Sequence, residues 1–240
     1  MTLFLSHRGE SDDAPENTLA AFKLAMDRDS DGIELDVRLT ADKQLVIVHD
    51  ADLKRVAGCD LTVSDSTLAE LQAVHPVPLF KDMLPLLKKG KHLQIELKGT
   101  DLDVIPKLKE VLDAWDGDRK QLAISSFEED TIKKAAEFFP DLPRVLLVDL
   151  AAKFGRFPSA SETAEYMKSL NCTGVSFKAD FAADRKFADE LHSLGMRVVA
   201  WGVFTDELGF AMAAAGVDAM TNNHAVALRA DWRKKSAASR

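Results

Sequence analysis

The segment GIELDVRLTADKQLVIVHD, residues 32–50, decides how this chain folds. It contains two runs of apolar and β-branched residues, Gly32–Val37 and Leu45–His49, each typical of a buried β-strand. Only the seven residues RLTADKQ separate them, whereas two parallel strands need a crossover of about a dozen residues or more. We therefore expect an antiparallel hairpin that extends the first of these strands beyond the rim of the main sheet.

Outside this hairpin, short apolar runs alternate with longer stretches of helical periodicity, a pattern typical of β/α units and a parallel sheet. The other predicted strands are Leu3–His7, Leu93–Leu97, Gln121–Ser126, Arg144–Val148, Gly174–Phe177, Arg197–Val203 and Val217–Thr221. The predicted helices are Asn17–Arg28, Phe80–Lys88, Leu102–Trp115, Glu128–Phe139, Ser161–Leu170, Ala183–Leu194, Asp206–Ala214 and Ala225–Trp232. Asn17, Ser161 and Thr205 are the expected N-caps. Without the returning hairpin strand eight β/α pairs remain, and these predict an α/β fold of the TIM (β/α)8 barrel type.

The length of the chain is consistent with one barrel domain over residues 1–240, since single α/β barrels commonly have about 200–250 residues. Residues 50–78 show little long periodicity, so we interpret them as a small insertion that lies over the carboxyl ends of the strands. The final residues RKKSAASR, 233–240, are predicted to be a frayed tail.

Charge and composition exclude several classes of partner. With 31 Lys and Arg against 39 Asp and Glu, the net charge is −8, so neither nucleic acid nor an anionic membrane surface is an expected partner. No apolar run approaches the ~18 residues of a membrane span, and the start MTLFLSHRGE has too short an apolar run for a signal peptide. Two isolated cysteines fit a reducing compartment, so we expect a cytoplasmic protein. Nothing in the composition predicts an oligomeric state.

Acidic residues interrupt two predicted strands near their carboxyl ends, where TIM barrels carry their chemistry. Glu34 and Asp36 are two residues apart and share one face of their strand, and Glu96 and Lys98 repeat this spacing on the next parallel strand. A buried, unpaired carboxylate is costly, so a single such pair could equally be an outward-facing charge or a salt bridge of the fold. Two pairs on adjacent strands favour a functional cluster instead.

Two histidines and two cations complete this cluster. His7 ends the first strand and His49 ends the hairpin, while Arg8 and Lys98 supply permanent positive charge. Three carboxylates without a cysteine suit one hard divalent cation, Mg²⁺ or Ca²⁺. Imidazoles beside a cation suggest a general acid and a general base, and the fixed positive charge suits an anionic substrate such as a phosphate. Together these residues predict metal-assisted cleavage of a phosphoester.

Longer stretches of the sequence resemble one known family, the glycerophosphodiester phosphodiesterases. The family pattern is HRG…PENT, a strand with Glu-x-Asp, then His-Asp and a later Glu-x-Lys. The matching runs here are HRGESDDAPENTLAAF (residues 7–22), GIELDVRLTADKQLVIVHD (32–50) and IELK (95–98). VPLFKDML (77–84) stands before IELK, and SSF (125–127), WGVF (201–204) and VDAMTN (217–222) follow it in the family's order, so the resemblance covers nearly the whole chain.

The resemblance implies a TIM barrel that binds one divalent cation and hydrolyses glycerophosphodiesters, which are small molecules, to sn-glycerol 3-phosphate and an alcohol. It also implies a role for each residue of the cluster. The metal ligands would be Glu34, Asp36 and Glu96. The acid/base pair would be His7 and His49. Arg8 and Lys98 would contact the phosphate or polarise the bound diester.

The sequence departs from the family pattern in three places, none of which is one of these seven residues. The loop between HRG and PENT is rich in acidic residues that would repel an anionic substrate unless the loop faces away. After the hairpin, a Thr-Thr pair common in relatives is missing. Near the end, TNNHAV (residues 221–226) replaces the usual Thr-Asp-x-Pro turn.

Four further residues each have two interpretations. Trp201 and Phe127 would line the pocket against the alcohol, or they pack in the barrel core or at its rim. Asp50 would support the hairpin histidine, or it caps a turn. Asn17 is interpreted in the first place as a helix N-cap, and the alternative is that its side chain orients the site.

Two other functions remain open at this stage. The first is phospholipase D-type activity on lysolipids or sphingomyelin, which would need an apolar surface at the site. The second is a non-catalytic barrel that binds a glycerophosphate-like ligand as a sensor.

Overall fold

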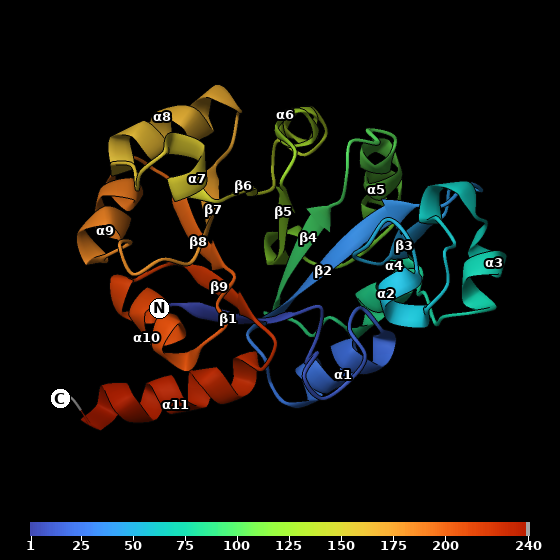
Figure 1. Ribbon diagram of the computed structural model, residues 1–240, viewed down its shortest axis with the longest axis horizontal. Coiled ribbons are helices and arrows are strands. Elements are labelled where there is room, and N and C mark those ends of the chain that lie inside the picture. The colour runs from blue at the N-terminus through green and yellow to red at the C-terminus, as the bar shows by residue number, and fades with distance from the viewer. Residues whose placement is uncertain (239–240) are drawn as a thin grey trace.

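The first and last strands of the sheet pair with each other and close it into a barrel (Figure 1). In this computed structural model, which describes residues 1–238, β1 (Leu3–His7) pairs in parallel with β9 (Ala219–Asn222) on one side and β2 (Gly32–Leu39) on the other. The remaining parallel strands of the ring are β4 (His92–Leu97), β5 (Leu122–Ser126), β6 (Arg144–Val148), β7 (Gly174–Lys178) and β8 (Arg197–Trp201). The predicted TIM barrel is confirmed.

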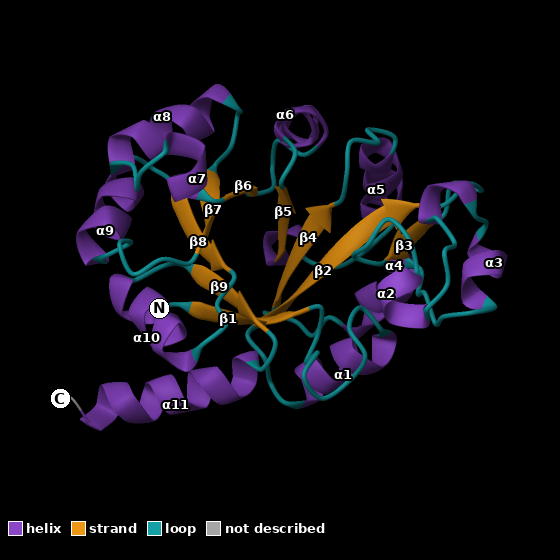
Figure 2. Cartoon of the chain, viewed as in Figure 1, coloured by secondary structure: helices purple, strands orange, loops and turns teal. Residues whose placement is uncertain are grey.

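Helices surround this ring on the outside (Figure 2). The longer ones are α1 (Leu19–Asp27), α5 (Val104–Asp113), α6 (Glu129–Phe138), α8 (Ala160–Ser169), α9 (Arg185–Ser193), α10 (Asp206–Ala215) and α11 (Ala225–Ala238). Shorter ones are α4 (Phe80–Met83), which a 3-10 turn at Leu84–Leu86 follows, and α7 (Leu150–Phe154), which was not predicted. Another 3-10 turn, Arg119–Gln121, precedes β5. No helix among residues 1–238 is both long enough and apolar enough to cross a membrane.

Two predicted N-caps and the predicted frayed tail differ from the structure. The N-cap of α1 is Thr18 rather than Asn17, and that of α8 is Ser159 rather than Ser161, because the hydroxyl groups of Thr18 and Ser159 accept the free backbone N–H groups. Thr205 caps α10 as predicted. Residues 233–238, predicted to fray, continue α11, and residues 239–240 of that predicted tail lie outside the described residues.

The predicted hairpin is present. β3 (Leu45–Ile47) lies antiparallel to the end of β2 and outside the closed ring. The segment that follows forms α2 (Lys54–Ala57), a 3-10 turn at Val63–Asp65 and α3 (Leu68–Gln72), all beside the hairpin in Figure 1. It has a small apolar core shared with the hairpin, made of Val46, Val48, Leu53, Val63, Leu71 and Val77.

Alternation along β2 sets the position of the site. Ile33, Leu35 and Val37 are fully buried in the layer between strands and helices. Because successive side chains of a strand point to opposite faces, Glu34 and Asp36 point into the barrel. The apolar residues that hold β2 against the helices therefore also direct two carboxylates toward the barrel axis.

Candidate active site

Three carboxylates converge inside the mouth of the barrel. Asp36 of β2 lies directly opposite Glu96 of β4 in the parallel register, and Glu34 is one pleat below Asp36. Each offers one oxygen, and these oxygens lie within 4.8 Å of one another. The three residues are 0–6% exposed, so water contributes little to the solvation of their charge. The structure thus brings together the three acidic residues selected from the sequence.

Two cations partly balance this charge. Lys98 Nζ lies 2.6 Å from Glu96 Oε1 and 3.6 Å from Asp36 Oδ1, and Arg8 Nε lies 3.3 Å from Asp36 Oδ2. Three carboxylates therefore face two permanent cations. If all five groups are ionised, one negative charge remains uncompensated in a buried position.

The pKa values of the carboxyl groups follow from this arrangement. Burial raises the pKa of Glu34 well above its usual value, and the neighbouring charges of Asp36 and Glu96 raise it further. Burial, and then Asp36, raise the pKa of Glu96 to about 7. Burial also opposes ionisation of Asp36, but Arg8 and Lys98 outweigh it and lower the pKa of that carboxyl.

The cluster fits a hard divalent cation. Glu34 Oε2 and Asp36 Oδ1 are buried and have no hydrogen-bond partner among residues 1–238. All the donors are oxygen atoms, which Mg²⁺ and Ca²⁺ prefer. A cation between the carboxylates would satisfy these oxygens and would neutralise the excess negative charge. A buried acidic triad able to bind a metal is therefore present.

The backbone around Arg8 holds its guanidinium over the carboxylates. Arg8 and Asn17 both have φ of 57°, and the backbone N–H of Asn17 donates to the carbonyl of Arg8 at 3.0 Å. Such left-handed conformations are strained for residues other than glycine and occur often at functional sites. A Cβ on Gly9 would lie 2.6 Å from the backbone of Ala21, so only glycine allows α1 to approach this closely. The HRG and PENT stretches therefore meet in space.

Asn17 contacts the cluster itself, since its Nδ2 donates to Asp36 Oδ2 at 2.8 Å. Of its two interpretations, the alternative one is correct. The side chain orients a site carboxylate, while Thr18 takes the role of N-cap.

Each of the two histidines is held through Nδ1. His7 Nδ1 lies 2.7 Å from Asn223 Oδ1, and its Nε2 is 3.9 Å from Glu34 Oε2. His49 Nδ1 donates to Asp50 Oδ1 at 2.6 Å, so Asp50 supports the histidine. Burial is the main cause that lowers the pKa of both imidazoles. Both rings are thus oriented by a partner, and burial favours their neutral forms.

The acidic loop after β1 does not leave free negative charge at the site. Glu16 pairs with Arg8 at 3.0 Å and with Arg55 of the insertion at 2.7 Å. Glu10 is buried and accepts from the Ser6 hydroxyl at 2.6 Å. Asp13 pairs with Arg28, and Asp12 with His224. Each of these acids has an ion-pair or hydrogen-bond partner, so the repulsion expected from the sequence is reduced.

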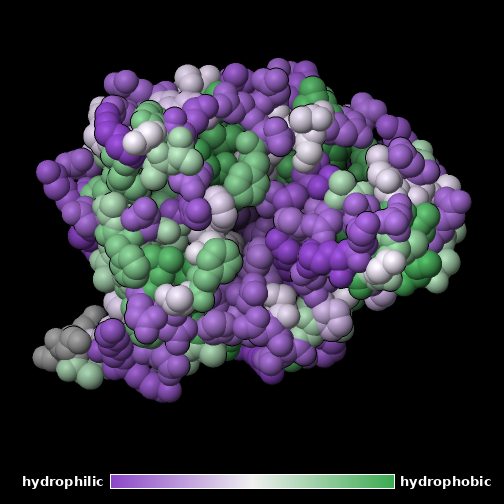
Figure 3. Space-filling view, in the orientation of Figure 1, coloured by the Kyte–Doolittle hydropathy of each residue, from purple (hydrophilic) through white to green (hydrophobic). Residues whose placement is uncertain are grey.

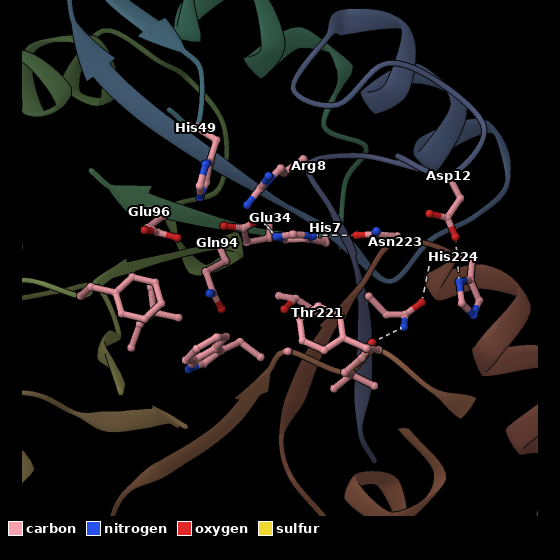
Figure 4. A pocket seen from close by; sticks show the side chains of 17 residues that line it. His7, Arg8, Asp12, Glu34, His49, Gln94, Glu96, Thr221, Asn223 and His224 are labelled. Atoms are coloured by element: carbon pink, nitrogen blue, oxygen red, sulfur yellow. Dashed lines mark hydrogen bonds and ion pairs between the residues drawn. The ribbon is translucent and has the colours of Figure 1, made fainter. Parts of the chain in front are cut away.

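A cavity of about 360 Å³ opens above the carboxylates, a size typical of small-molecule sites. His7, Glu34, Glu96 and His49 gather on one side of it (Figure 4). Figure 3 shows hydrophilic side chains beside the central hollow near β2 and β4, and hydrophobic ones toward β7 and β8. The lining is therefore polar on the side of the carboxylates and apolar on the other.

The apolar side contains both aromatic residues singled out from the sequence. Phe127 and Trp201 line the cavity and meet edge to face, with ring centroids 5.1 Å apart. Leu147, Val203 and Phe204 also line it, and Phe204 is 79% exposed. Arg8 lines the cavity as well, whereas the ammonium of Lys98 faces the carboxylates.

Sequence reasoning missed several polar residues of the cavity. Gln94 could have been found, because it precedes Glu96 by two residues and shares its face of β4. Asn223 and His224 gave no such signal, since they approach the site only through pairing of the last strand with the first. His224 links two loops at the rim, with Nδ1 3.0 Å from Asp12 Oδ2 and Nε2 3.1 Å from Asp206 Oδ1.

A TIM barrel with a buried carboxylate cluster and two oriented imidazoles at its mouth has the architecture of an enzyme. The model of the glycerophosphoryl diester phosphodiesterase family matches residues 7–227, so the chain belongs to this family of phosphodiester-cleaving enzymes.

Individual relatives agree with this assignment. A glycerophosphodiester phosphodiesterase of Bacillus altitudinis is 31% identical over 73% of this chain and 79% of its own. A lysophospholipase D of Rattus norvegicus is 36% identical over 58% of this chain and 41% of its own. The structure is similar to that of a phosphodiesterase of Oleispira antarctica in complex with sn-glycerol-3-phosphate, with a TM-score of 0.81, 26% identity, and coverage of 94% of both chains.

Replacing one carboxylate separates cation binding from folding. We expect Glu34→Gln to weaken Mg²⁺ or Ca²⁺ binding at least about tenfold. The unfolding free energy of the metal-free protein should fall by no more than about 1 kcal/mol, or rise, because a neutral amide of the same shape avoids the cost of burying a charge beside Asp36 and Glu96. Calorimetric titration and urea unfolding measure the two quantities. Glu10→Gln, at a buried glutamate outside the cluster, is the matched control and should leave cation affinity unchanged. Equal affinity in both variants would contradict the assignment.

The His224 link should make stability depend on pH. Burial lowers the pKa of His224, but hydrogen bonds to Asp206 and Asp12 outweigh this and raise it above 6.5. The stabilisation is therefore complete below about pH 6.5 and disappears as the pH rises through the pKa in the folded protein. Because the ring is partly exposed, we expect less than about 1 kcal/mol. Unfolding curves of wild type and His224→Gln should differ at pH 5.5 to 6 and converge above about pH 9; a difference that grows with pH would disprove the link.

Proposed function

We propose that this protein hydrolyses glycerophosphodiesters to sn-glycerol 3-phosphate and an alcohol, with one divalent cation and two histidines. The observation that carries the proposal is the convergence of three buried carboxylates with two imidazoles at one cavity. The Oleispira antarctica relative, whose structure holds sn-glycerol-3-phosphate, supports the same substrate class.

The proposed metal ligands are Glu34, Asp36 and Glu96. A cation bound there would withdraw negative charge from the phosphate as the transition state develops. Asn17 and Lys98 would orient Asp36 and balance the charge of the carboxylates, through the contacts that they already make.

The remaining side chains act on the substrate directly. Arg8 lines the cavity and would hold the anionic phosphate, since its guanidinium stays charged at all relevant pH values. Phe127 and Trp201 would pack against the alcohol group. The ammonium of Lys98 is engaged by Asp36 and Glu96 and does not point to the phosphate. It would act on the diester mainly by reducing the negative charge of the site.

His7 and His49 would move the protons. One imidazole, in its neutral form, accepts the proton of the attacking hydroxyl as its oxygen bonds to phosphorus, and the other, which enters the step protonated, gives a proton to the alcohol oxygen as the old P–O bond breaks. The attacking hydroxyl belongs either to water or to the glycerol of the substrate. A transient cyclic phosphate, visible by ³¹P NMR, would identify the second route.

Activity measurements test this proposal. The wild type should release sn-glycerol 3-phosphate from glycerophosphocholine in the presence of Mg²⁺ or Ca²⁺, and a chelator should abolish the release. His7→Ala and His49→Ala should each lower kcat by about 10²- to 10⁴-fold, because each removes one proton-transfer group. His92→Ala, at the amino end of β4 and outside the cavity, is the control. Chelator-resistant activity, or full activity in both variants, would refute the mechanism. Ligand binding without turnover would favour the sensor.

A second candidate function is lysophospholipase D activity. Phe204 and Phe127 stand at the apolar side of the cavity and are 79% and 44% exposed, so they could contact the acyl chain of a lysolipid. The similarity to a lysophospholipase D of Rattus norvegicus points in the same direction.

Substrate preference distinguishes the two functions. If acyl chains bind here, Phe204→Ser should lower kcat/KM for lysophosphatidylcholine relative to glycerophosphocholine about 10- to 100-fold, as expected for the loss of roughly 1.5 to 3 kcal/mol of side-chain burial. The ratio is measured with both substrates below the micelle concentration of the lysolipid. An unchanged ratio would exclude a lysolipid site at Phe204.

A further inference from the structure

We propose that Asn223 is a positioning residue that fixes the tautomer of His7, with the proton on Nδ1 and the lone pair of Nε2 turned toward the reaction site. The inference rests on the proposed function only in giving His7 a role in catalysis. The hydrogen bond itself is a property of this chain, formed where TNNHAV replaces the turn that is usual in the family.

Barrel closure brings the two residues together. β1 and β9 pair in register from Leu3 opposite Ala219 to Ser6 opposite Asn222. The residues that come next in the chain are His7, the last residue of β1, and Asn223, just after β9, so both lie at the same end of the barrel. Asn223 Oδ1 reaches His7 Nδ1 at 2.7 Å (Figure 4). They are 216 positions apart in the chain.

The residues on either side of Asn223 hold it in place. Asn222 is 3% exposed; its Nδ2 donates to the carbonyl of Val203 at 2.7 Å, and its Oδ1 accepts the backbone N–H of His224 at 2.8 Å. The ring of His224 in turn faces Asp12 and Asp206. Each neighbour of Asn223 is thus anchored to another part of the barrel. Asn223 itself is exposed. Within residues 1–238, the one hydrogen bond that its side chain makes is the bond to His7.

The chemistry of the contact decides which nitrogen carries the proton. An amide oxygen can only accept a hydrogen bond, so Nδ1 of His7 must donate. A neutral imidazole has one proton, which leaves Nε2 as an acceptor. Nε2 is the nitrogen on the cavity side, 3.9 Å from Glu34 Oε2. In this tautomer the ring can take a proton from a group bound in the cavity.

The two histidines of the site therefore have partners of different charge. His49 donates from Nδ1 to the carboxylate of Asp50, whereas His7 donates to a neutral amide. In both rings Nδ1 is the nitrogen that contacts the partner. Asn223→Asp would give His7 the kind of partner that His49 has, and Asn223→Leu would keep the size of the side chain but remove the acceptor.

A spectroscopic experiment tests the tautomer without relying on activity. Imidazole ¹⁵N–¹H correlation spectra of the metal-free protein at pH 7.5, with the His7 signals assigned from the His7→Gln variant, report which nitrogen is protonated. We expect Nδ1–H in the wild type and in Asn223→Asp, and a shift toward Nε2–H in Asn223→Leu. Wild type with Nε2–H, or an unchanged tautomer in Asn223→Leu, would overturn the proposal.

Kinetics test whether the tautomer matters for the reaction. Asn223→Leu should lower kcat for glycerophosphocholine about 10- to 100-fold with KM within about twofold, and Asn223→Asp should restore most of it. Ala227→Leu, at an exposed position in the first turn of α11, is the control for changes in this region, and thermal melts check that each variant folds. Full activity of Asn223→Leu, with His7→Ala inactive, would overturn the positioning role. An inactive wild type would refute the proposed function, while the spectra would still decide the tautomer.

Discussion

Three carboxylates buried side by side at the barrel mouth are the constraint on which the site depends. Glu34, Asp36 and Glu96 have lost most of their contact with water, and Arg8 and Lys98 compensate only two of the three charges. Taking such charges out of water is costly. Burial raises the pKa of Glu34 and of Glu96, because protonation removes part of the charge that would otherwise be buried without a cation. A divalent cation would turn the excess negative charge into a positive one, suited to a phosphate.

The surrounding charges keep this costly cluster in one geometry. A chain of ion pairs of alternating sign runs from the cluster through Arg8, Glu16 and Arg55 to Asp50, which accepts a hydrogen bond from His49. Several of these pairs are partly exposed, so each stabilises the fold only slightly. Their combined effect is geometric. They connect the loop after β1 to the insertion after the hairpin. They thereby connect His49 to Arg8, the arginine beside the three carboxylates.

Local patterns in the sequence predicted what local physics determines. Seven residues between two strands are too few for a crossover, so the hairpin and the direction of His49 followed directly. Period-two spacing placed Glu34 and Asp36 on one face. Asn223 could not be found in this way, because its position depends on pairing between the first and last strands. Asn17 was assigned mainly to a cap because the sequence does not reveal its left-handed backbone, which turns the amide toward Asp36.

Crystals of the protein grown with Mn²⁺ and sn-glycerol 3-phosphate would test the central claim most directly. An anomalous difference map locates the metal without reference to any expected site. The account predicts one strong peak bonded to an oxygen of each of Glu34, Asp36 and Glu96, at the roughly 2.0–2.6 Å typical of hard cations with oxygen ligands, with the phosphate on its open side. A peak elsewhere, or none while phosphate fills the cavity, would contradict it.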